Sequence, residues 1–495
     1  MSTTIQATTP LIDETAFSGR IFIDGEWVAA GGGEIASVAP ATGETIATVG
    51  IASPADVARA AAGAAKAQKE WAATPHPARA AVLRRAAQLW EEHADEIMSW
   101  NVREVGAIPP LAGFALHVTA AECYEAASLP SAPLGSILAS EEPRLSLAQQ
   151  VPVGVVGVIS PFNVPLILGI RAVAPALALG NAVLLKPDPR TIVTGGVSMV
   201  RIFEEAGLPA GLLQLVPGGA DVGEAMVTDP NVDVIAFTGS TRAGRIVGEL
   251  AGKHLKRVHL ELGGNSAFII REDADVDQAV NLATWGSYLH QGQICMTVGR
   301  HIVHESIFEE YVARLSAKAD SMVVGDPAAG QVHLGPLIDE VQRDRVHTLV
   351  QDAVAQGADL RAGGDYESLF YRPTVLANTP QDAAAYHDEV FGPVASVVPY
   401  STDDEAVELA ARTEYGLALG IVSRDVMAAL AMAQRIPSGI VHINDQTVND
   451  EANAPFGGVG ASGTGSRHGG AQANIDAFTE TRWITLRREP GQYPL

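Results

Sequence analysis

The middle of the chain alternates short apolar runs with segments whose apolar residues recur at helical spacing. The apolar runs are residues 151–160, 181–187, 212–219, 232–240 and 257–264. The helical segments between them are residues 174–180, 194–207, 221–229 and 241–252. Apolar strands separated by helices are typical of a parallel sheet built from βαβ units. The pattern therefore predicts a doubly wound, Rossmann-like sheet with a crossover helix between successive strands.

The regions on either side have regular patterns of their own. Asp24 and Gly25 separate two alternating apolar stretches, which predicts a β-hairpin, and a second extended pair is expected around residues 40–49. The Ala-rich segments 54–72 and 78–105 have the apolar spacing of helices. These elements predict an α/β protein whose helices pack on the sheet.

Another α/β series begins at Ser266 and continues to about residue 440. A chain of 495 residues exceeds one ordinary core, so two or three domains with clefts between them are expected. The segments 135–150 and 478–495 look like extended arms, which either pair with a neighbouring subunit or form a plain surface hairpin.

Charge and cysteine content exclude several classes of protein. The formal charge is −24 and Lys and Arg form no cluster, which argues against DNA or RNA as a partner. Cys123 and Cys295 cannot build a disulfide framework or a thiolate metal site, and two free thiols suit a reducing compartment. Residues 1–19 show no secretory signal, and no apolar run reaches the length of about 18 residues that spans a membrane. We expect a cytoplasmic protein without a metal.

The segment GQICMTVGR, residues 292–300, contains the first candidate for chemistry. A lone cysteine such as Cys295 in apolar surroundings is more often a small buried hydrophobe than a nucleophile. Its Gly and polar neighbours nevertheless favour a tight loop that presents the thiol in a cleft, where it can be activated as the thiolate. Both interpretations stay open on this segment alone.

Two polar residues lie at or just after the ends of strands that otherwise read as buried. Glu261 in LELGGN is either a general base whose pKa is raised by an apolar setting or a member of a structural ion pair. Asn163 in ISPFNVPL is either a turn former or an amide donor to a developing alkoxide, an effect worth about 3 kcal/mol. In FTGSTRAG, Gly239 and Ser240 mark a strand-to-helix turn that could hold a pyrophosphate, although the spacing is not the GxGxxG fingerprint. Lys186 ends a neighbouring strand and could add a cationic contact.

Together these motifs resemble the aldehyde dehydrogenase superfamily. The shared segments, in the family's order, are SPFNVPL, GNAVLLKP, AFTGST, LELGGN, GQIC, EVFGP and APFGGVGASG. The resemblance implies an α/β aldehyde dehydrogenase fold: a Rossmann-like cofactor domain, an α/β catalytic domain and a small β oligomerisation arm. The resemblance implies that residues 1–134 and 151–263 form the cofactor domain and residues 264–440 the catalytic domain. Residues 135–150 and 478–495 would form the arm. Residues 441–477 would lead the chain back to the cofactor domain and line the active site. Family members are usually dimers or tetramers, so a homodimer or homotetramer is expected.

The resemblance also implies roles for single residues. Cys295 would attack the aldehyde carbon, Asn163 and the Cys295 backbone amide would hold the oxyanion, and Glu261 would activate the water that hydrolyses the thioester. Lys186 and Glu389 would contact ribose hydroxyls of a nicotinamide cofactor. The full set of implied cofactor-binding residues is Ser160, Pro161, Lys186, Gly219, Gly239, Ser240, Glu389 and Phe391.

Several positions depart from the family pattern. Many members have a Trp-Lys pair where this chain has Arg171 and Ala172, and Ser466 and Arg467 replace part of the common GRE motif. A proton exit from Glu261 through those family residues therefore cannot be carried over.

The cofactor motif departs as well. A Glu that often binds the adenosine ribose is replaced by Pro189, between Asp188 and Arg190. Because a lost carboxylate and a nearby Arg would tolerate a 2′-phosphate, NAD is expected and NADP remains possible.

These departures are shared with the benzaldehyde and vanillin dehydrogenase branch, which the segment HINDQTVNDE resembles most distinctively. An aromatic aldehyde is therefore the expected substrate, although an aliphatic aldehyde is an alternative. A flat aromatic ring needs a largely apolar pocket. The residues near the family's pocket positions are Val164, Ile167, Trp285, Ile294, Met296, Thr447 and Phe456, each of which could instead be a core residue.

Three rival functions remain. A coenzyme A-acylating enzyme would keep Cys295 but change the acyl acceptor, and the presence of Glu261 argues for water instead. A cysteine hydrolase pairing Cys295 with His290 would have no use for a nicotinamide site. A non-catalytic binding protein would be expected to lose the thiol or the base, and both are present.

Overall fold

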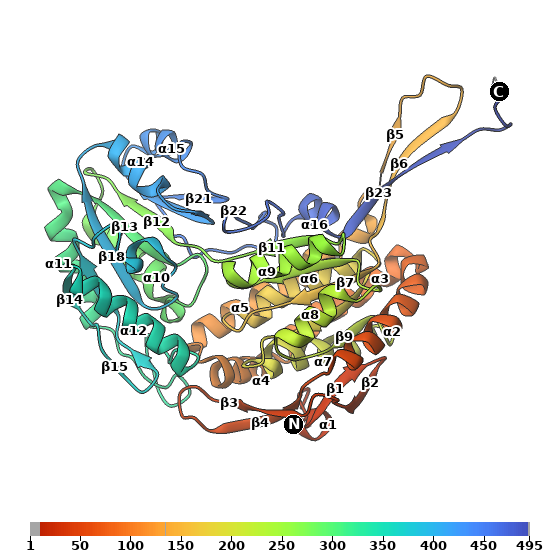
Figure 1. Cartoon of the computed structure of the whole chain (residues 1–495), viewed down its shortest axis with the longest axis horizontal. Helices are drawn as coiled ribbons and strands as arrows, with labels where there is room; N and C mark the ends of the chain where they lie inside the picture. The colour runs from red at the N-terminus through yellow and green to blue at the C-terminus, as the bar shows by residue number, and fades with distance from the viewer. Residues whose placement is uncertain (1–9, 134, 494–495) are drawn as a thin grey trace, which may run out of the picture.

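The computed structural model describes residues 10–133 and 135–493 and contains two large sheets that lie side by side (Figure 1). The strands of the first sheet, in spatial order, are β11 (Arg257–Glu261), β10 (Val234–Thr238), β7 (Val155–Ile159), β8 (Ala182–Lys186), β9 (Leu213–Leu215), β1 (Arg20–Ile23) and β2 (Glu26–Ala29). From β11 to β9 the strands are parallel, and β1 and β2 add an antiparallel edge. The strand order reverses between β7 and β10, and ligands bind at such a switch point in open α/β sheets.

The predicted strands and hairpins are all present. Asp24 and Gly25 have φ of 53° and 85°, as a two-residue hairpin turn between β1 and β2 requires. The second extended pair is β3 (Glu34–Val38) with β4 (Thr45–Gly50). The sequence therefore predicted this sheet correctly, because buried parallel strands leave uninterrupted apolar runs.

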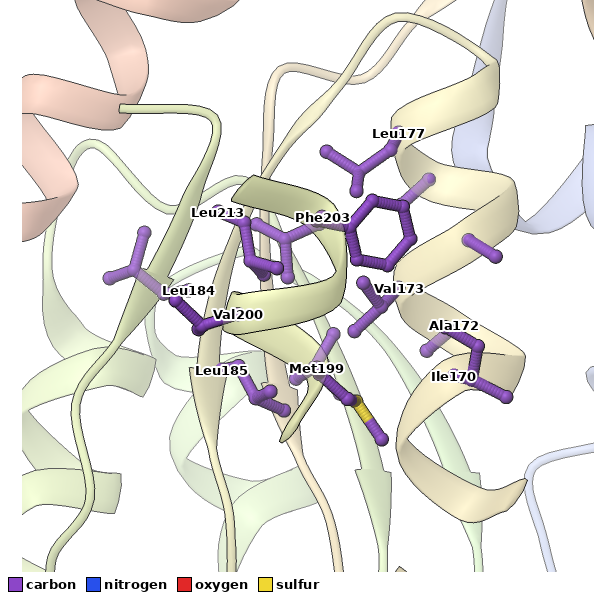
Figure 2. Packing of buried hydrophobic residues seen from close by; sticks show 14 of the residues in the cluster. Ile170, Ala172, Val173, Leu177, Leu184, Leu185, Met199, Val200, Phe203 and Leu213 are labelled. Atoms are coloured by element: carbon purple, nitrogen blue, oxygen red, sulfur yellow. The ribbon is translucent and has the colours of Figure 1, made fainter. Parts of the chain in front are cut away.

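The crossover helices are α6 (Pro165–Ala178), α7 (Ser198–Glu205), α8 (Ala220–Thr228) and α9 (Thr241–Lys253). Figure 2 shows Val173 and Leu177 of α6 pointing toward Phe203 of α7, in the largest apolar core of the described chain. Helix α6 begins well before the predicted start at residue 174. Nearly all of its residues are buried, so it has no polar face to reveal a helical period.

The N-terminal helices cover this sheet. They are α2 (Pro54–Ala73), α3 (His76–Glu92), α4 (Ala94–Trp100) and α5 (Pro109–Ala126). The single helix predicted over 78–105 is instead divided at His93, whose backbone leaves the helical region. A π-helical turn, Asn101–Val105, leads from α4 toward α5.

The second sheet carries the other half of the molecule. Its strands, in spatial order, are β14 (Asp359–Ala362), β17 (Thr374–Ala377), β18 (Val394–Tyr400), β13 (Val298–His304), β12 (Ser266–Ile270), β20 (Ala418–Val422) and β21 (Ile440–Ile443). Its helices are α10 (Val276–Tyr288), α11 (Phe308–Asp320), α12 (Glu340–Ala355), α13 (Ala384–His387), α14 (Asp403–Ala411) and α15 (Val426–Ala433). This second α/β series matches the expectation for residues 266–440.

The two arm-like segments meet in a separate three-stranded sheet. Strand β23 (Thr479–Leu486) pairs with β6 (Leu145–Pro152), which pairs in turn with β5 (Gly135–Leu138). The sheet projects from the body of the molecule beyond α16 (Ala471–Phe478) (Figure 1). The remaining elements are α1 (Glu14–Phe17), β15 (Tyr366–Glu367), β16 (Phe370–Tyr371), β19 (Tyr415–Gly416) and β22 (Val459–Gly460). Within the described ranges, no helix is long and apolar enough to cross a membrane.

Candidate active site

Cys295 lies in the loop that joins α10 to β13. Three consecutive residues before it, His290, Gln291 and Gly292, have φ of 53°, 57° and 67°. This left-handed region is costly for the two non-glycine residues, so the loop must be held by its surroundings. The Gln291 amide donates to the carbonyl of Pro336 at 2.8 Å, and the His290 ring bonds to the Asn163 carbonyl at 2.8 Å. These contacts fix the loop that presents the thiol.

Asn163 follows β7 and is buried. Its Nδ2 donates to the carbonyl oxygen of Gln293 at 2.8 Å, two residues before Cys295. The side-chain nitrogen of Asn carries two hydrogens. The bond to Gln293 uses one of them and fixes the plane of the amide, so the second N–H is free to donate to a ligand. The structure thus brings the predicted oxyanion donor and the predicted nucleophile to one place.

Two cavities meet at Cys295 and Asn163, because both residues line each of them. One is a largely apolar cavity that holds about 900 Å³ of empty space, its open mouth included. Its lining residues are Pro110, Leu111, Phe114, Asn163, Val164, Ile167, Leu168, Arg171, Trp285, Leu289, Ile294, Cys295, Met296, Gln446, Val448, Asn449, Asp450 and Phe456. A mostly apolar lining with a few polar groups is typical of a pocket for a small molecule.

Six of the seven predicted pocket residues line this apolar cavity. Thr447 does not: its hydroxyl is buried and donates to the Met296 carbonyl, so it supports the wall. Trp285 lines the cavity with its side chain half exposed. The sequence reasoning missed Leu111 and Phe114 of α5, because no local pattern shows that this distant helix reaches the site.

The other cavity is a longer and more polar cleft at the carboxyl ends of the first sheet's strands, and it holds about 1700 Å³ of empty space with its mouth. All but one of the predicted cofactor-binding residues line it, namely Ser160, Pro161, Lys186, Gly239, Ser240, Glu389 and Phe391. The exception is Gly219, which precedes the first turn of α8 and is not part of the lining.

The cleft fits a dinucleotide. The N-terminus of α9 opens into it, and the Ser240 hydroxyl caps that helix by accepting from the Ala243 amide at 3.3 Å. Free backbone amides at a helix N-terminus favour a bound phosphate. Lys186 is buried at the end of β8, and this burial lowers the pKa of its amine. A buried cation in such a cleft is suited to a polar or anionic partner.

Glu389 lies at the edge of the cleft. Its Oε1 accepts from the backbone N–H of Gly264 at 3.0 Å, which leaves Oε2 for another donor such as a ribose hydroxyl. Burial raises the pKa of this carboxyl to about 7. The ring of Phe391 packs edge-on against Phe162, 5.9 Å between centroids, on the cleft wall.

Arg190 is tied to carboxylates. Its Nε and Nη2 donate to the two oxygens of Asp188 at 2.8 and 2.9 Å, and its Nη1 donates to Asp339 at 2.7 Å. The guanidinium also lies over the Phe162 ring, 4.1 Å from its centroid. Arg190 is therefore held by two carboxylates, and Asp188 keeps a negative charge in the cleft close to Lys186.

The thiol and the carboxyl at this site are both shifted toward their neutral forms. Burial, with Glu389 and Glu261 nearby, raises the pKa of the Cys295 thiol to about 12. Burial raises the pKa of Glu261 to about 8, against the opposing effect of Arg171 and Arg467. A carboxyl with a pKa near neutrality is suited to general base catalysis. Glu261 makes no structural ion pair within hydrogen-bonding distance in the described chain, so that alternative reading of the residue is not supported.

Arg171 occupies the centre of a buried charge cluster. Its Nε is 3.3 Å from Glu122, its Nη2 pairs with Asp450, and its guanidinium lies 4.3 Å above the Phe456 ring. The sequence singled out Arg171 only as a departure from the family pattern, because its partners lie on α5 and in a distant loop. Burial raises the pKa of Glu122 to about 7.

Comparison with known proteins agrees with this geometry. Residues 27–484 match the model of the aldehyde dehydrogenase family. The chain is 62% identical to a vanillin dehydrogenase of an Amycolatopsis species, covering 98% of this chain and 99% of that protein. It is 47% identical to a benzaldehyde dehydrogenase [NAD(+)] of Pseudomonas putida, covering 97% and 99%. A salicylaldehyde dehydrogenase from Pseudomonas putida G7, solved with salicylaldehyde, superposes with a TM-score of 0.93 at 35% identity, covering 96% and 99%.

The agreement extends over the fold and nearly the whole sequence. The sequence-based expectation of an α/β aldehyde dehydrogenase fold is confirmed, and so is the resemblance to the benzaldehyde and vanillin dehydrogenase branch. The chain therefore belongs to the aldehyde dehydrogenase family.

Proposed function

We propose that this protein oxidises aromatic aldehydes to carboxylic acids with NAD, through a covalent intermediate on Cys295. The observation that carries the proposal is that Cys295 and Asn163 lie where an apolar cavity meets a polar cleft. A ring in the apolar cavity would bring its aldehyde group to the thiol, and a dinucleotide in the cleft would reach the same carbon from the other side. The named substrates of the relatives, vanillin, benzaldehyde and salicylaldehyde, support an aromatic aldehyde.

In the first step the Cys295 sulfur bonds to the aldehyde carbon, and the carbonyl oxygen becomes an oxyanion. The free N–H of Asn163 and the backbone N–H of Cys295 would stabilise that charge. Because the thiol has a raised pKa, its proton must leave as the bond forms, and Glu261 is a carboxyl of suitable pKa to receive it.

In the second step the tetrahedral carbon loses hydride and becomes a thioester on Cys295. Bound NAD would supply the hydride acceptor, and Lys186, Glu389 and the N-terminus of α9 would hold it in the cleft. Glu261 releases to solvent the proton that it took from the thiol, and the carboxylate then takes a proton from water as the water oxygen bonds to the thioester carbon. The carbon–sulfur bond breaks, the acid leaves, and the proton on Glu261 passes to the sulfur, which restores the thiol.

The surroundings of Arg190 favour NAD over NADP. Both Asp188 and Asp339 accept from its guanidinium, so its charge is already compensated. A 2′-phosphate in this part of the cleft would meet the carboxylate of Asp188, whereas a 2′-hydroxyl could donate to it. The relative that is named for its use of NAD agrees with this preference.

The proposal is tested by following the absorbance of reduced nicotinamide with benzaldehyde, vanillin, salicylaldehyde and hexanal, each with NAD and NADP. We expect the aromatic aldehydes with NAD to give the highest kcat/KM. A clear preference for hexanal would refute the aromatic assignment, and no cofactor reduction with any aldehyde would refute the oxidation itself. Addition of coenzyme A separates the acyl-transfer alternative: free acid formed at the same rate without it supports hydrolysis.

Assembly through the arm is the second part of the proposal. The sheet of β5, β6 and β23 exposes Ile137, Leu145, Trp483 and Leu486 away from the body of the molecule. Such apolar residues on a protruding sheet favour burial against another subunit, as a homodimer or homotetramer. We also infer a cytoplasmic location from the two free cysteines. Light scattering of the purified protein would test the assembly, and a monomer at micromolar concentration would contradict it.

A further inference from the structure

A small hollow lies behind the catalytic cavity, on the side of Glu261. Its lining residues are Val158, Leu168, Arg171, Ala172, Ala236, Thr238, Glu261, Phe456 and His468. Leu168, Arg171 and Phe456 also line the apolar cavity, so the hollow and the cavity share a wall. The space is about large enough for one water molecule.

Four buried polar atoms belong to the residues around this hollow. They are Oε1 and Oε2 of Glu261, Nη1 of Arg171 and Nδ1 of His468, and none makes a hydrogen bond of good geometry within residues 10–133 and 135–493. The backbone N–H of Gly458 lies close enough to the Glu261 carboxylate to lower its pKa, so one oxygen has a weak contact and the rest of its capacity is free. Burying such groups without partners is costly, because each has given up its hydrogen bonds to water. A buried water typically makes about three hydrogen bonds to groups of this kind. Both the number of free polar groups and the size of the hollow therefore suit one bound water molecule.

Two of the positions that depart from the family pattern, Arg171 and Ala172, line this hollow. Ala172 stands where many family members have Lys, and its methyl group lines the space that a longer side chain would enter. Arg171 stands where many family members have Trp. Its Nε and Nη2 pair with Glu122 and Asp450, so Nη1 remains free to donate to a water in the hollow. The hollow is thus a feature of this chain's own residues.

We propose that this hollow binds one ordered water that joins Glu261 to Arg171 and His468, and that Arg171 and His468 are positioning residues that hold the Glu261 carboxyl for thioester hydrolysis. The inference rests on the proposed role of Glu261 as the base. The water accepts from Nη1 of Arg171 and donates to Nδ1 of His468. The second hydrogen of the water can be donated to the Glu261 carboxylate before proton transfer. After proton transfer, the second lone pair of the water can accept from the carboxylic acid. No bond to carbon changes at this water.

The chemistry of His468 suits the acceptor role. Burial, with the nearby His259 and Arg171, lowers the pKa of His468 to about 3, so the ring is neutral and one nitrogen is free to accept. The other ionisable groups whose charge acts on Glu261 are Arg171 and Arg467, both cations. Because the pKa of His468 lies far below neutrality, its ring stays neutral and available to accept a hydrogen bond while Glu261 gains and loses its proton.

The test measures the decay of the acyl-enzyme directly. The benzoyl-enzyme on Cys295 is formed with benzaldehyde and NAD, or with p-nitrophenyl benzoate and no nucleotide, and is followed by quenching and intact mass. We expect His468→Leu to slow this decay by about tenfold, less than the loss of a general base itself. His468→Asn places an amide near the position of Nδ1 and should stay within about twofold of the parent.

Two further variants separate the water from packing. Ala172→Leu should fill the hollow and slow the decay without touching His468, so it tests the proposal even if His468→Leu does not fold. His259→Leu is the matched control: His259 is equally buried and lies 6.0 Å from the His468 ring, but it does not line the hollow. Its acyl-enzyme should decay as in the parent, and the unfolding midpoint of each variant shows whether the substitution disturbs the fold.

The outcomes distinguish this inference from the function on which it rests. No acyl adduct on Cys295 of the parent, or normal decay in Glu261→Gln, would overturn the proposed mechanism. If decay of the acyl-enzyme slows in Glu261→Gln but is unchanged in both His468→Leu and Ala172→Leu, the water site is overturned and the role of Glu261 stands. A crystal structure of the parent should show an ordered water between the three side chains, and a dry hollow would also overturn it.

Discussion

The side-chain amide of Asn163 donates to the backbone carbonyl of Gln293 at 2.8 Å, across 130 positions of sequence. This bond links the end of the first sheet to the loop that carries Cys295. The return contact, from the His290 ring to the Asn163 carbonyl at 2.8 Å, doubles the link. The relative position of Cys295 and Asn163 is therefore set by hydrogen bonds between the two halves of the molecule.

Asn163→Ala removes both the proposed oxyanion donor and the bond to Gln293. We expect kcat to fall by about 100-fold, because an oxyanion donor contributes on the order of 3 kcal/mol to the transition state. Steady-state rates with benzaldehyde and NAD measure the loss. Nucleotide binding, followed by fluorescence quenching, should be retained as the control, and a rate within fivefold of the parent would contradict the assignment.

Hydrolysis of the acyl-enzyme should depend on pH through Glu261. With a pKa of about 8, the carboxyl is mostly protonated at pH 6 and mostly ionised at pH 9. Because only the ionised form can accept a proton from water, we expect the decay to quicken by about tenfold per pH unit below 8 and to level off above it. Glu261→Gln should abolish this limb of the profile, and a profile that falls as the pH rises would refute the role of base.

The raised pKa of Cys295 predicts a slow reaction with alkylating reagents. The thiolate is the reactive form, so iodoacetamide should label this thiol at pH 7 at least about tenfold more slowly than a free cysteine, and faster as the pH rises. Peptide mapping by mass spectrometry identifies the labelled residue. Cys123 is fully buried and should remain unlabelled in the native protein. Rapid labelling of Cys295 that does not vary with pH would show that the thiol is already ionised.

Removing the Asp188 carboxylate should shift cofactor preference. In Asp188→Ser, Arg190 loses its bidentate partner and the negative charge in the cleft disappears, so a 2′-phosphate becomes better tolerated. We expect the ratio of kcat/KM with NADP to that with NAD to rise by about tenfold, or 1.4 kcal/mol. Asp339→Asn is the matched control, because it frees one nitrogen of Arg190 but keeps Asp188. An unchanged ratio in Asp188→Ser would exclude this carboxylate as the determinant.

The strands and most helices of the first sheet could be predicted because their signals are local. The run that became β7 is apolar without interruption, and α9 has one apolar face. Helix α6 was predicted only in its second half, because a fully buried helix has no periodic contrast. The break at His93 was missed, since nothing in the apolar pattern of 78–105 marks a change of direction.

The site was predictable where a residue type and its place on a strand both indicate chemistry. Glu261 and Asn163 met that condition, and Cys295 was singled out by its Gly and polar neighbours. The structure places Cys295 and Asn163 on the wall of the same two cavities, whereas Glu261 lines only the small hollow behind them. Thr447 and Gly219 did not line the expected cavities, because nearness in sequence to a lining residue does not fix where a side chain points.

The sequence by itself determined the strands of the first sheet and the family to which the chain belongs, and it singled out Cys295, Glu261 and Asn163 as the candidates for nucleophile, base and amide donor. Only the tertiary structure decided that Arg171 meets Asp450 across 279 positions, that Asp188 and Asp339 hold Arg190, and that His468 borders the hollow beside Glu261. The physical reason is the distance along the chain over which each kind of interaction acts. Periodicity and motifs express interactions between neighbours in the chain, whereas the pairing of buried charges depends on which distant segments the packing of the sheets brings together.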